Sequence, residues 1–131
     1  MRIYISGPMT GYPNSNRESF DKQAEYWRSL GHFVINPHDI TSVFGSAHEI
    51  AMAFAYTYGM LTSYNDDEKK AMTRLARSVM DADIAALRTC DRIVLLRGWR
   101  ISRGAKEELA EAIRCGLEIE EGLHERRAGD H

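Results

Sequence analysis

Short apolar runs alternate along the chain with longer stretches in which apolar residues recur every three or four positions. Residues 3–5 form an apolar run that ends at a Ser-Gly-Pro turn, as a buried strand does. Residues 16–31 carry a helical stripe that starts behind Asn16, a candidate N-cap, and ends at a glycine. A second strand-like run, residues 32–35, stops at an Asn-Pro pair. Strand, helix and strand in this order predict a βαβ unit, which implies a parallel sheet.

Residues 38–80 are predicted to form a helical insertion. A capping-box pattern from Ser46 to Glu49 precedes a short helix over residues 50–58. Asn65 is the candidate cap of a long helix that reaches to about residue 89. We expect the insertion to form either an oligomer interface or a lid over a pocket, because aromatic residues and Met are enriched at interfaces. Its aromatic and apolar cluster consists of Tyr56, Tyr58, Met60, Leu61 and Tyr64.

The last third of the chain contains the clearest strand. Residues 93–96 are apolar at every position, as expected for a central parallel strand. A helix is predicted from Ser102 or Arg103 to about Cys115, where Gly116 stops it. An edge strand is predicted at residues 117–119, before a polar and flexible tail.

This order predicts a three-layer α/β domain. We expect a Rossmann-like or flavodoxin-like parallel sheet of about four to five strands, with helices on both faces. Residues 1–120 form the single domain and residues 121–131 the tail. Ligands in such folds bind outside the carboxyl ends of the strands, so the chemistry is expected there.

Composition limits the function. The chain has 131 residues, with 17 Lys and Arg against 19 Asp and Glu, a formal charge of −2. Such a balance argues against a nucleic acid polymer as partner, which needs many cations to displace counterions, so we expect a small ligand. No stretch approaches the roughly 18 apolar residues of a membrane span, and we expect a cytoplasmic protein with no membrane partner. Cys90 and Cys115 are both predicted to be buried small hydrophobes.

Two loops behind predicted strands are candidate ligand sites. The first runs from Ser6 to Gly11, and its glycines let the backbone approach a ligand closely, although a plain turn fits equally. It matches neither the dinucleotide nor the P-loop fingerprint. The second, residues 97–106, places cations at a helix N-terminus, which favours a phosphate or carboxylate; a solvated basic loop is the alternative. Its four cations are Arg97, Arg100, Arg103 and Lys106.

Two carboxylates are candidate catalytic groups. Asp83 lies on the apolar stripe of the long helix, where an acid needs a partner or a function. Glu107 and Glu108 are adjacent on the next helix and point about 100° apart, so only one can face the crevice. Asp83 and Glu108 can form a pair in which one attacks an anomeric carbon and the other exchanges protons. The five histidines lack the spacing of a metal site, although His38 can lie at the crevice, and no metal or cofactor is expected.

Three blocks of the sequence resemble the nucleoside 2-deoxyribosyltransferase superfamily, and within it small phage and bacterial members. The first block reads Tyr4-Ile5-Ser6-Gly7-Pro8-Met9-Thr10-Gly11 and is similar to the family's substrate-binding loop. The second begins at Asp83 and leads into the run at 93–96. The third, Ser102-x-Gly104-x-x-x-Glu108-Leu109, is similar to the block that holds the family's nucleophile.

The resemblance implies a role for each matching residue. Glu108 attacks C1′ of a 2′-deoxyribosyl group and forms a covalent intermediate, while Asp83 protonates the departing base or orients the nucleophile. Tyr4 positions the sugar and Glu108, Gly7 gives room for the substrate, and Glu107 is a surface acid. The resemblance also implies a homo-oligomer, a dimer or an assembly of dimers. The implied substrate-binding residues are Ser6, Gly7, Pro8, Met9, Thr10, Gly11, Ser102, Arg103 and Gly104.

The expected substrate is a 2′-deoxynucleoside 5′-monophosphate or a 2′-deoxynucleoside, with the sugar released to water by a hydrolase or to another base by a transferase. Ser102 and its neighbouring cations favour the hydrolase, whose members bind phosphate with a serine at this position. Thr10 stands where the hydrolases have an arginine, and Arg17 is a candidate substitute. The alternative from another class is a catalytically silent nucleotide-binding module of the same fold.

Overall fold

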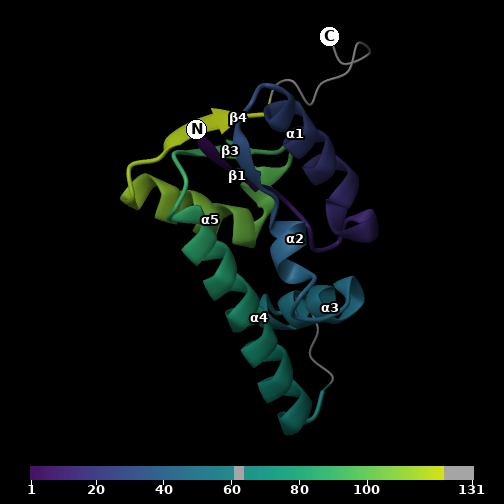
Figure 1. Cartoon of the computed structure of the whole chain (residues 1–131). Coiled ribbons are helices and arrows are strands. Elements are labelled where there is room, and N and C mark those ends of the chain that lie inside the picture. Colours follow the sequence, from purple (N-terminus) through teal and green to yellow (C-terminus); the bar gives the residue numbers. More distant parts are fainter. Residues whose placement is uncertain (61–63, 123–131) are drawn as a thin grey trace.

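A parallel sheet of four strands forms the centre of the computed structural model, which describes residues 1–60 and 64–122 (Figure 1). The strand order is β2-β1-β3-β4, and every neighbouring pair is parallel. The predicted α/β class and the predicted sheet are therefore confirmed. The strands are β1 (Arg2–Ser6), β2 (Phe33–Ile35), β3 (Arg92–Leu95) and β4 (Glu118–Glu121).

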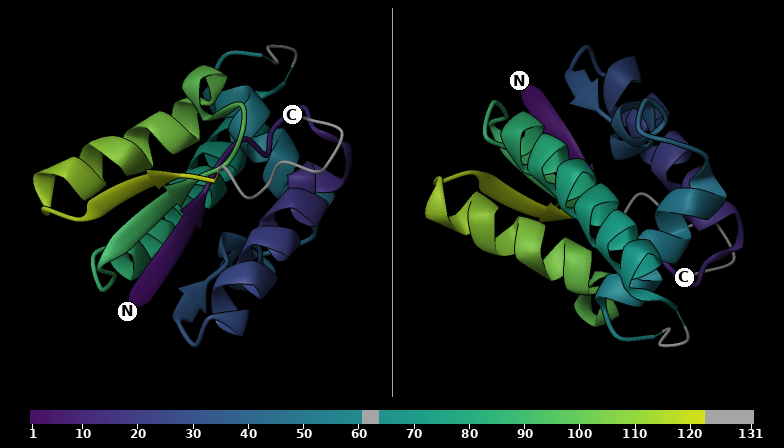
Figure 2. Two further views of the ribbon diagram at one scale, coloured as in Figure 1. Left: turned by 90° about the horizontal axis from the view of Figure 1, so that it is seen from above. Right: turned by 90° about the horizontal axis from the view of Figure 1, so that it is seen from below.

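Helices cover both faces of the sheet, so the domain has three layers (Figure 2). Ile3 and Ile5 belong to one core with the apolar residues of α1 (Arg17–Ser29). Tyr4 points to the opposite face, into a core with Leu87 of α4 (Asp66–Leu87) and Ala112 of α5 (Arg103–Arg114). Alternate residues of a strand point to opposite faces, and this period sets which side chains of β1 can meet α5.

The helix starts in the first half of the chain agree in part with the predictions. Asn16 precedes α1, but it has a left-handed backbone with φ 62° and makes no capping bond. Its side-chain amide instead donates to the Pro8 carbonyl at 2.9 Å, which ties the loop after β1 to α1. The short helix α2 (Pro37–Thr41) lies at the start of the predicted helical insertion, where no separate helix was expected; the Asn36 side chain caps it by accepting from the His38 amide at 3.1 Å.

The insertion is helical, as predicted. The capping box forms at the start of α3 (Ala47–Thr57), where the Ser46 hydroxyl accepts from the Glu49 amide at 3.1 Å. The Asn65 side chain caps α4 by accepting from the Glu68 amide at 2.9 Å. The first half of α4 extends beyond the sheet, with α3 beside it (Figure 1). Two 3-10 turns complete the described elements, η1 (Pro13–Asn16) and η2 (Trp99–Ile101).

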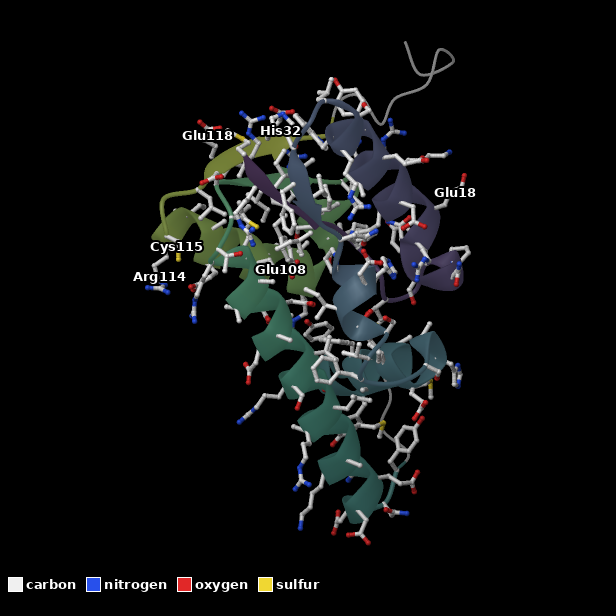
Figure 3. All side chains as sticks on the ribbon, in the orientation of Figure 1. Glu18, His32, Glu108, Arg114, Cys115 and Glu118 are labelled. Carbon is white, nitrogen blue, oxygen red and sulfur yellow. The ribbon has the colours of Figure 1, made fainter. Side chains whose placement is uncertain are left out.

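Two predictions at the end of the chain are wrong. Cys90 is buried, but Cys115 is exposed, because it follows the last turn of α5 on the outer surface (Figure 3). The edge strand extends further than predicted, since β4 includes Glu121, the first residue assigned to the tail. The rest of the tail from residue 123, like Leu61 of the aromatic cluster, lies outside the described residues. None of the described helices is long and apolar enough to cross a membrane.

Candidate active site

A cavity lies at the carboxyl ends of the two central strands. From β1 the chain crosses to β2 on one side, and from β3 it crosses to β4 on the other, which makes the gap between β1 and β3 a switch point of the topology. The cavity measures about 280 Å³ and is lined by the loop after β1, by α2, α3 and α4, and by the start of α5. The crevice predicted from strand order is therefore present.

Glu108 is held at the wall of this cavity. It lies in the second turn of α5 and is only 6% exposed, near the centre of the molecule (Figure 3). The Tyr4 hydroxyl donates to Oε2, and the Ser6 hydroxyl donates to Oε1 at 2.7 Å. Both donors lie on the α5 side of β1, two residues apart, so one strand fixes both oxygens of the carboxylate. Glu107, in contrast, is exposed, as predicted for a surface acid.

Asp83 approaches the same cavity from α4. Its side chain lines the cavity and is 5% exposed, and Oδ1 has no hydrogen-bond partner among the described residues. A buried carboxyl oxygen without a partner is costly unless the group is neutral or a ligand binds it. The structure thus brings together the two carboxyls that the sequence singled out.

The two carboxyls are unequal. Burial and the Glu108 charge raise the pKa of Asp83 well above its usual range. Burial also raises the pKa of Glu108, but the bonds from Tyr4 and Ser6 oppose this rise by stabilising the carboxylate. Burial raises the pKa of Tyr4 further still, so its hydroxyl keeps the proton that it donates. Glu108 is therefore the first of the pair to ionise, and Asp83 keeps its proton to higher pH.

Part of the loop after β1 lines the cavity, and part of it packs elsewhere. Gly7, Pro8, Met9 and Thr10 line the cavity, whereas the described lining residues do not include Ser6, which lies behind Glu108, or Gly11. Gly7 lines the cavity, and the structure adds a second reason for a glycine at this position. A Cβ there would lie 2.7 Å from Leu96 Cβ, so the small residue lets the end of β1 pack against the residue that follows β3.

The start of α5 is the polar end of the cavity. Ser102, Arg103 and Gly104 line it, and the Ser102 hydroxyl caps the helix by accepting from the Ala105 amide at 3.2 Å. The cations do not all gather there as expected. Arg100 stacks on Trp99 and pairs with Glu121 at 3.1 Å, while Arg97 and Lys106 are exposed. Of the four cations, only Arg103 is among the described lining residues.

Arg17 does not take the place of a phosphate-binding arginine in the loop. Its guanidinium pairs with Asp21 at 3.4 Å and with Asp39 at 3.8 Å. Arg17 is not among the described residues that line the cavity. These contacts link α1 to α2 and leave the first loop without a cation in the cavity wall.

The insertion supplies one wall of the cavity. Ile50, Phe54 and Tyr58 of α3 and its C-terminal turn line the cavity, as does Met60, which supports the lid interpretation over a purely external interface. Tyr56, by contrast, contacts the Tyr64 ring. The capping box and the apolar run behind it were the available signals, but neither indicates which side chains turn inward.

His38 lies at the crevice, as the sequence allowed. It is 5% exposed, lines the cavity, and its Nε2 has no hydrogen-bond partner among the described residues. Burial lowers the pKa of His38, and the nearby Arg17 charge lowers it further, so the ring is neutral at pH 7. Within residues 1–60 and 64–122, no three His, Cys, Asp or Glu side chains are placed to hold a metal ion.

Comparison with known proteins gives a family without an assigned activity. No curated protein matches the chain. One family model, described as a domain of unknown function (DUF4406), matches residues 1–69 and 67–121. These two stretches contain both carboxyls, the loop after β1 and the insertion. The chain therefore belongs to the DUF4406 family.

Proposed function

We propose that this protein cleaves the N-glycosidic bond of a 2′-deoxynucleoside 5′-monophosphate or 2′-deoxynucleoside. The observation that carries the proposal is the Glu108 carboxyl group, held by two hydroxyl donors at the wall of a cavity that Asp83 also lines. A buried, oriented carboxylate beside a carboxylic acid is what double displacement at an anomeric carbon requires.

In the first step, a Glu108 oxygen attacks C1′ of the deoxyribose and forms an ester bond. The bond from C1′ to the base nitrogen breaks, and its electron pair leaves with the base. Asp83 gives its proton to the departing base, which is released neutral. The raised pKa of Asp83 supports this role, because it keeps the acid protonated at neutral pH.

In the second step, Asp83 acts as a base. Water attacks C1′, its proton passes to the Asp83 carboxylate, and the ester bond breaks to return the Glu108 carboxylate. A nitrogen of a second base can replace the water, which would make the protein a transferase. We favour the hydrolase, because Ser102 and the start of α5 offer an anion site at the polar end of the cavity.

This mechanism accords with membership of the nucleoside 2-deoxyribosyltransferase superfamily, which we propose for the chain. The support is positional. The three blocks that resemble the superfamily contribute Tyr4, Asp83 and Glu108, which lie together although 104 residues separate the first from the last. We also retain the expected homo-oligomer as a proposal.

Release of free base tests the proposed function. The protein is incubated with each deoxynucleoside and each deoxynucleoside 5′-monophosphate, with and without a second base, and free base is separated by chromatography. Wild type and Glu107→Gln, which changes the exposed neighbour, are expected to release base at similar rates. The rate of base release by Glu108→Gln is expected to be at least a thousandfold lower. Tight binding without release by wild type would instead identify a silent binding module, and full activity of Glu108→Gln would refute the mechanism.

A further inference from the structure

Tyr58 brings an unpartnered hydroxyl to the start of α5. The residue follows α3 directly, and its hydroxyl oxygen is buried without a hydrogen-bond partner among the described residues. A Cβ added to Gly104 would lie 3.3 Å from this oxygen, which places the hydroxyl against the first turn of α5. Burial raises the pKa of Tyr58 to about 12, so the group remains a hydrogen-bond donor at neutral pH. A buried donor without an acceptor is expected to meet one in a ligand.

Two further kinds of hydrogen-bond donor lie at this end of the cavity. The Arg103 guanidinium lies over the Tyr58 ring, 4.8 Å from its centre, and both residues line the cavity. The first turn of an α-helix has amide groups without partners inside the helix, and Ser102 caps only that of Ala105. A hydroxyl, a guanidinium and helix amides therefore lie at the same end of the cavity, which suits an anion.

The distance from this end to the nucleophile suits a nucleotide. Glu108 follows Gly104 by four residues, which corresponds to ~6 Å along a helix axis. That span is comparable with a pentose measured from C1′ to its 5′ substituent. A sugar with C1′ at Glu108 can thus direct its 5′ group toward Tyr58 and Arg103.

We infer that Tyr58 and Arg103 bind the 5′-phosphate of the substrate and make the enzyme selective for deoxynucleoside 5′-monophosphates over deoxynucleosides. The inference rests on the proposed function for the sugar position. It gives the insertion a role in substrate specificity, because Tyr58 belongs to the insertion. Tyr58 donates its hydroxyl hydrogen to a phosphate oxygen, and Arg103 supplies the opposite charge while its guanidinium remains over the Tyr58 ring.

Selectivity is tested with matched substrate pairs. The value of kcat/KM is measured for one deoxynucleoside 5′-monophosphate and for the deoxynucleoside with the same base. Wild type is expected to prefer the monophosphate. Tyr58→Phe and Arg103→Gln are each expected to lower kcat/KM for the monophosphate by roughly ten- to a hundredfold, the range of a hydrogen bond to a charged group. Neither is expected to change kcat/KM for the deoxynucleoside more than about threefold, since the lost donor has no partner there.

Two control variants match these changes. Tyr56→Phe removes a hydroxyl from the last turn of α3, two residues before Tyr58, and Lys106→Gln removes an exposed cation from α5; both variants are expected to resemble wild type with either substrate. If Tyr58→Phe lowers kcat/KM equally for both substrates, or for neither, the inference is overturned while the proposed function stands.

Binding separates the inference from the proposed function. In the Glu108→Gln background, the affinities for the same two compounds are measured by calorimetry, with and without Tyr58→Phe. The monophosphate is expected to bind more tightly than the deoxynucleoside. Tyr58→Phe is expected to lower the ratio of the two affinities at least tenfold. This result supports the phosphate site even if wild type releases no base. Equal affinity for the two compounds in the Glu108→Gln protein contradicts it.

Discussion

Replacing Asp83 with Asn is expected to stabilise the fold while it abolishes activity. Burial and the Glu108 charge raise the pKa of Asp83 to about 9, far above that of an aspartate in an unfolded chain. A carboxyl whose pKa is raised by folding contributes full stability only below its unfolded pKa, and stability falls as the pH rises toward the folded pKa. Asn keeps the shape of the protonated acid and does not titrate, so this loss disappears in the variant.

The magnitude follows from the proton that folding retains. Each pH unit above the unfolded pKa of about 3.9 costs about 1.4 kcal/mol while Asp83 stays protonated in the fold. At pH 7 the upper bound on this loss in the free energy of unfolding is about 4 kcal/mol. Because Asn has its own amide to satisfy in the cavity, we expect a gain of about 1–4 kcal/mol.

The assay is urea denaturation at pH 5, 6, 7 and 8, with Asp81→Asn as the control. Asp81 lies two residues earlier on α4 and is exposed, so Asp81→Asn makes the same chemical substitution outside the buried site. The free energy of unfolding of Asp83→Asn is expected to exceed that of wild type by an amount that grows with pH. A destabilised Asp83→Asn protein, or a gain independent of pH, would refute the assignment of a buried, protonated Asp83.

Two further substitutions test the support of Glu108 and the packing of the loop. Tyr4→Phe removes a donor to the Glu108 carboxylate, so the acid limb of the pH profile of kcat/KM is expected to move to higher pH by about one to two units; an unmoved limb would contradict the positioning role of Tyr4. Gly7→Ala places a Cβ 2.7 Å from Leu96 Cβ, and a loss of about 1–3 kcal/mol is expected in urea denaturation; unchanged stability would show that the packing there is loose.

The order of strands and helices was predictable because local signals coincide with the tertiary structure. Runs that are apolar at every position, such as residues 93–96, can be buried only inside a covered sheet. The caps at Ser46, Asn65 and Ser102 form because side-chain oxygens compete well for helix amides close in sequence. Asp83 stood out because an acid on an apolar stripe conflicts with burial unless a partner or a function offsets it.

What the sequence did not reveal depends on contacts between distant segments. Ser6 supports Glu108 because β1 and α5 face each other, which neither segment encodes alone. Position 7 requires glycine because of Leu96, a neighbour across the sheet. The cations near α5 were expected to converge, but Arg100 pairs with Glu121 once β4 lies beside β3. Tyr58 is placed by the packing of α3 on α4, for which the helical pattern gives no direction.

The covalent intermediate is the most direct test of the proposed mechanism. Wild-type protein is mixed with deoxynucleoside 5′-monophosphates, quenched during turnover and digested, and the α5 peptide that holds Glu108 is analysed by mass spectrometry. The mechanism predicts that this peptide gains the mass of one deoxyribosyl group, bonded to Glu108, and that Glu108→Gln shows no such gain. Release of base by wild type with no adduct on Glu108, or with the adduct on another residue, would contradict it.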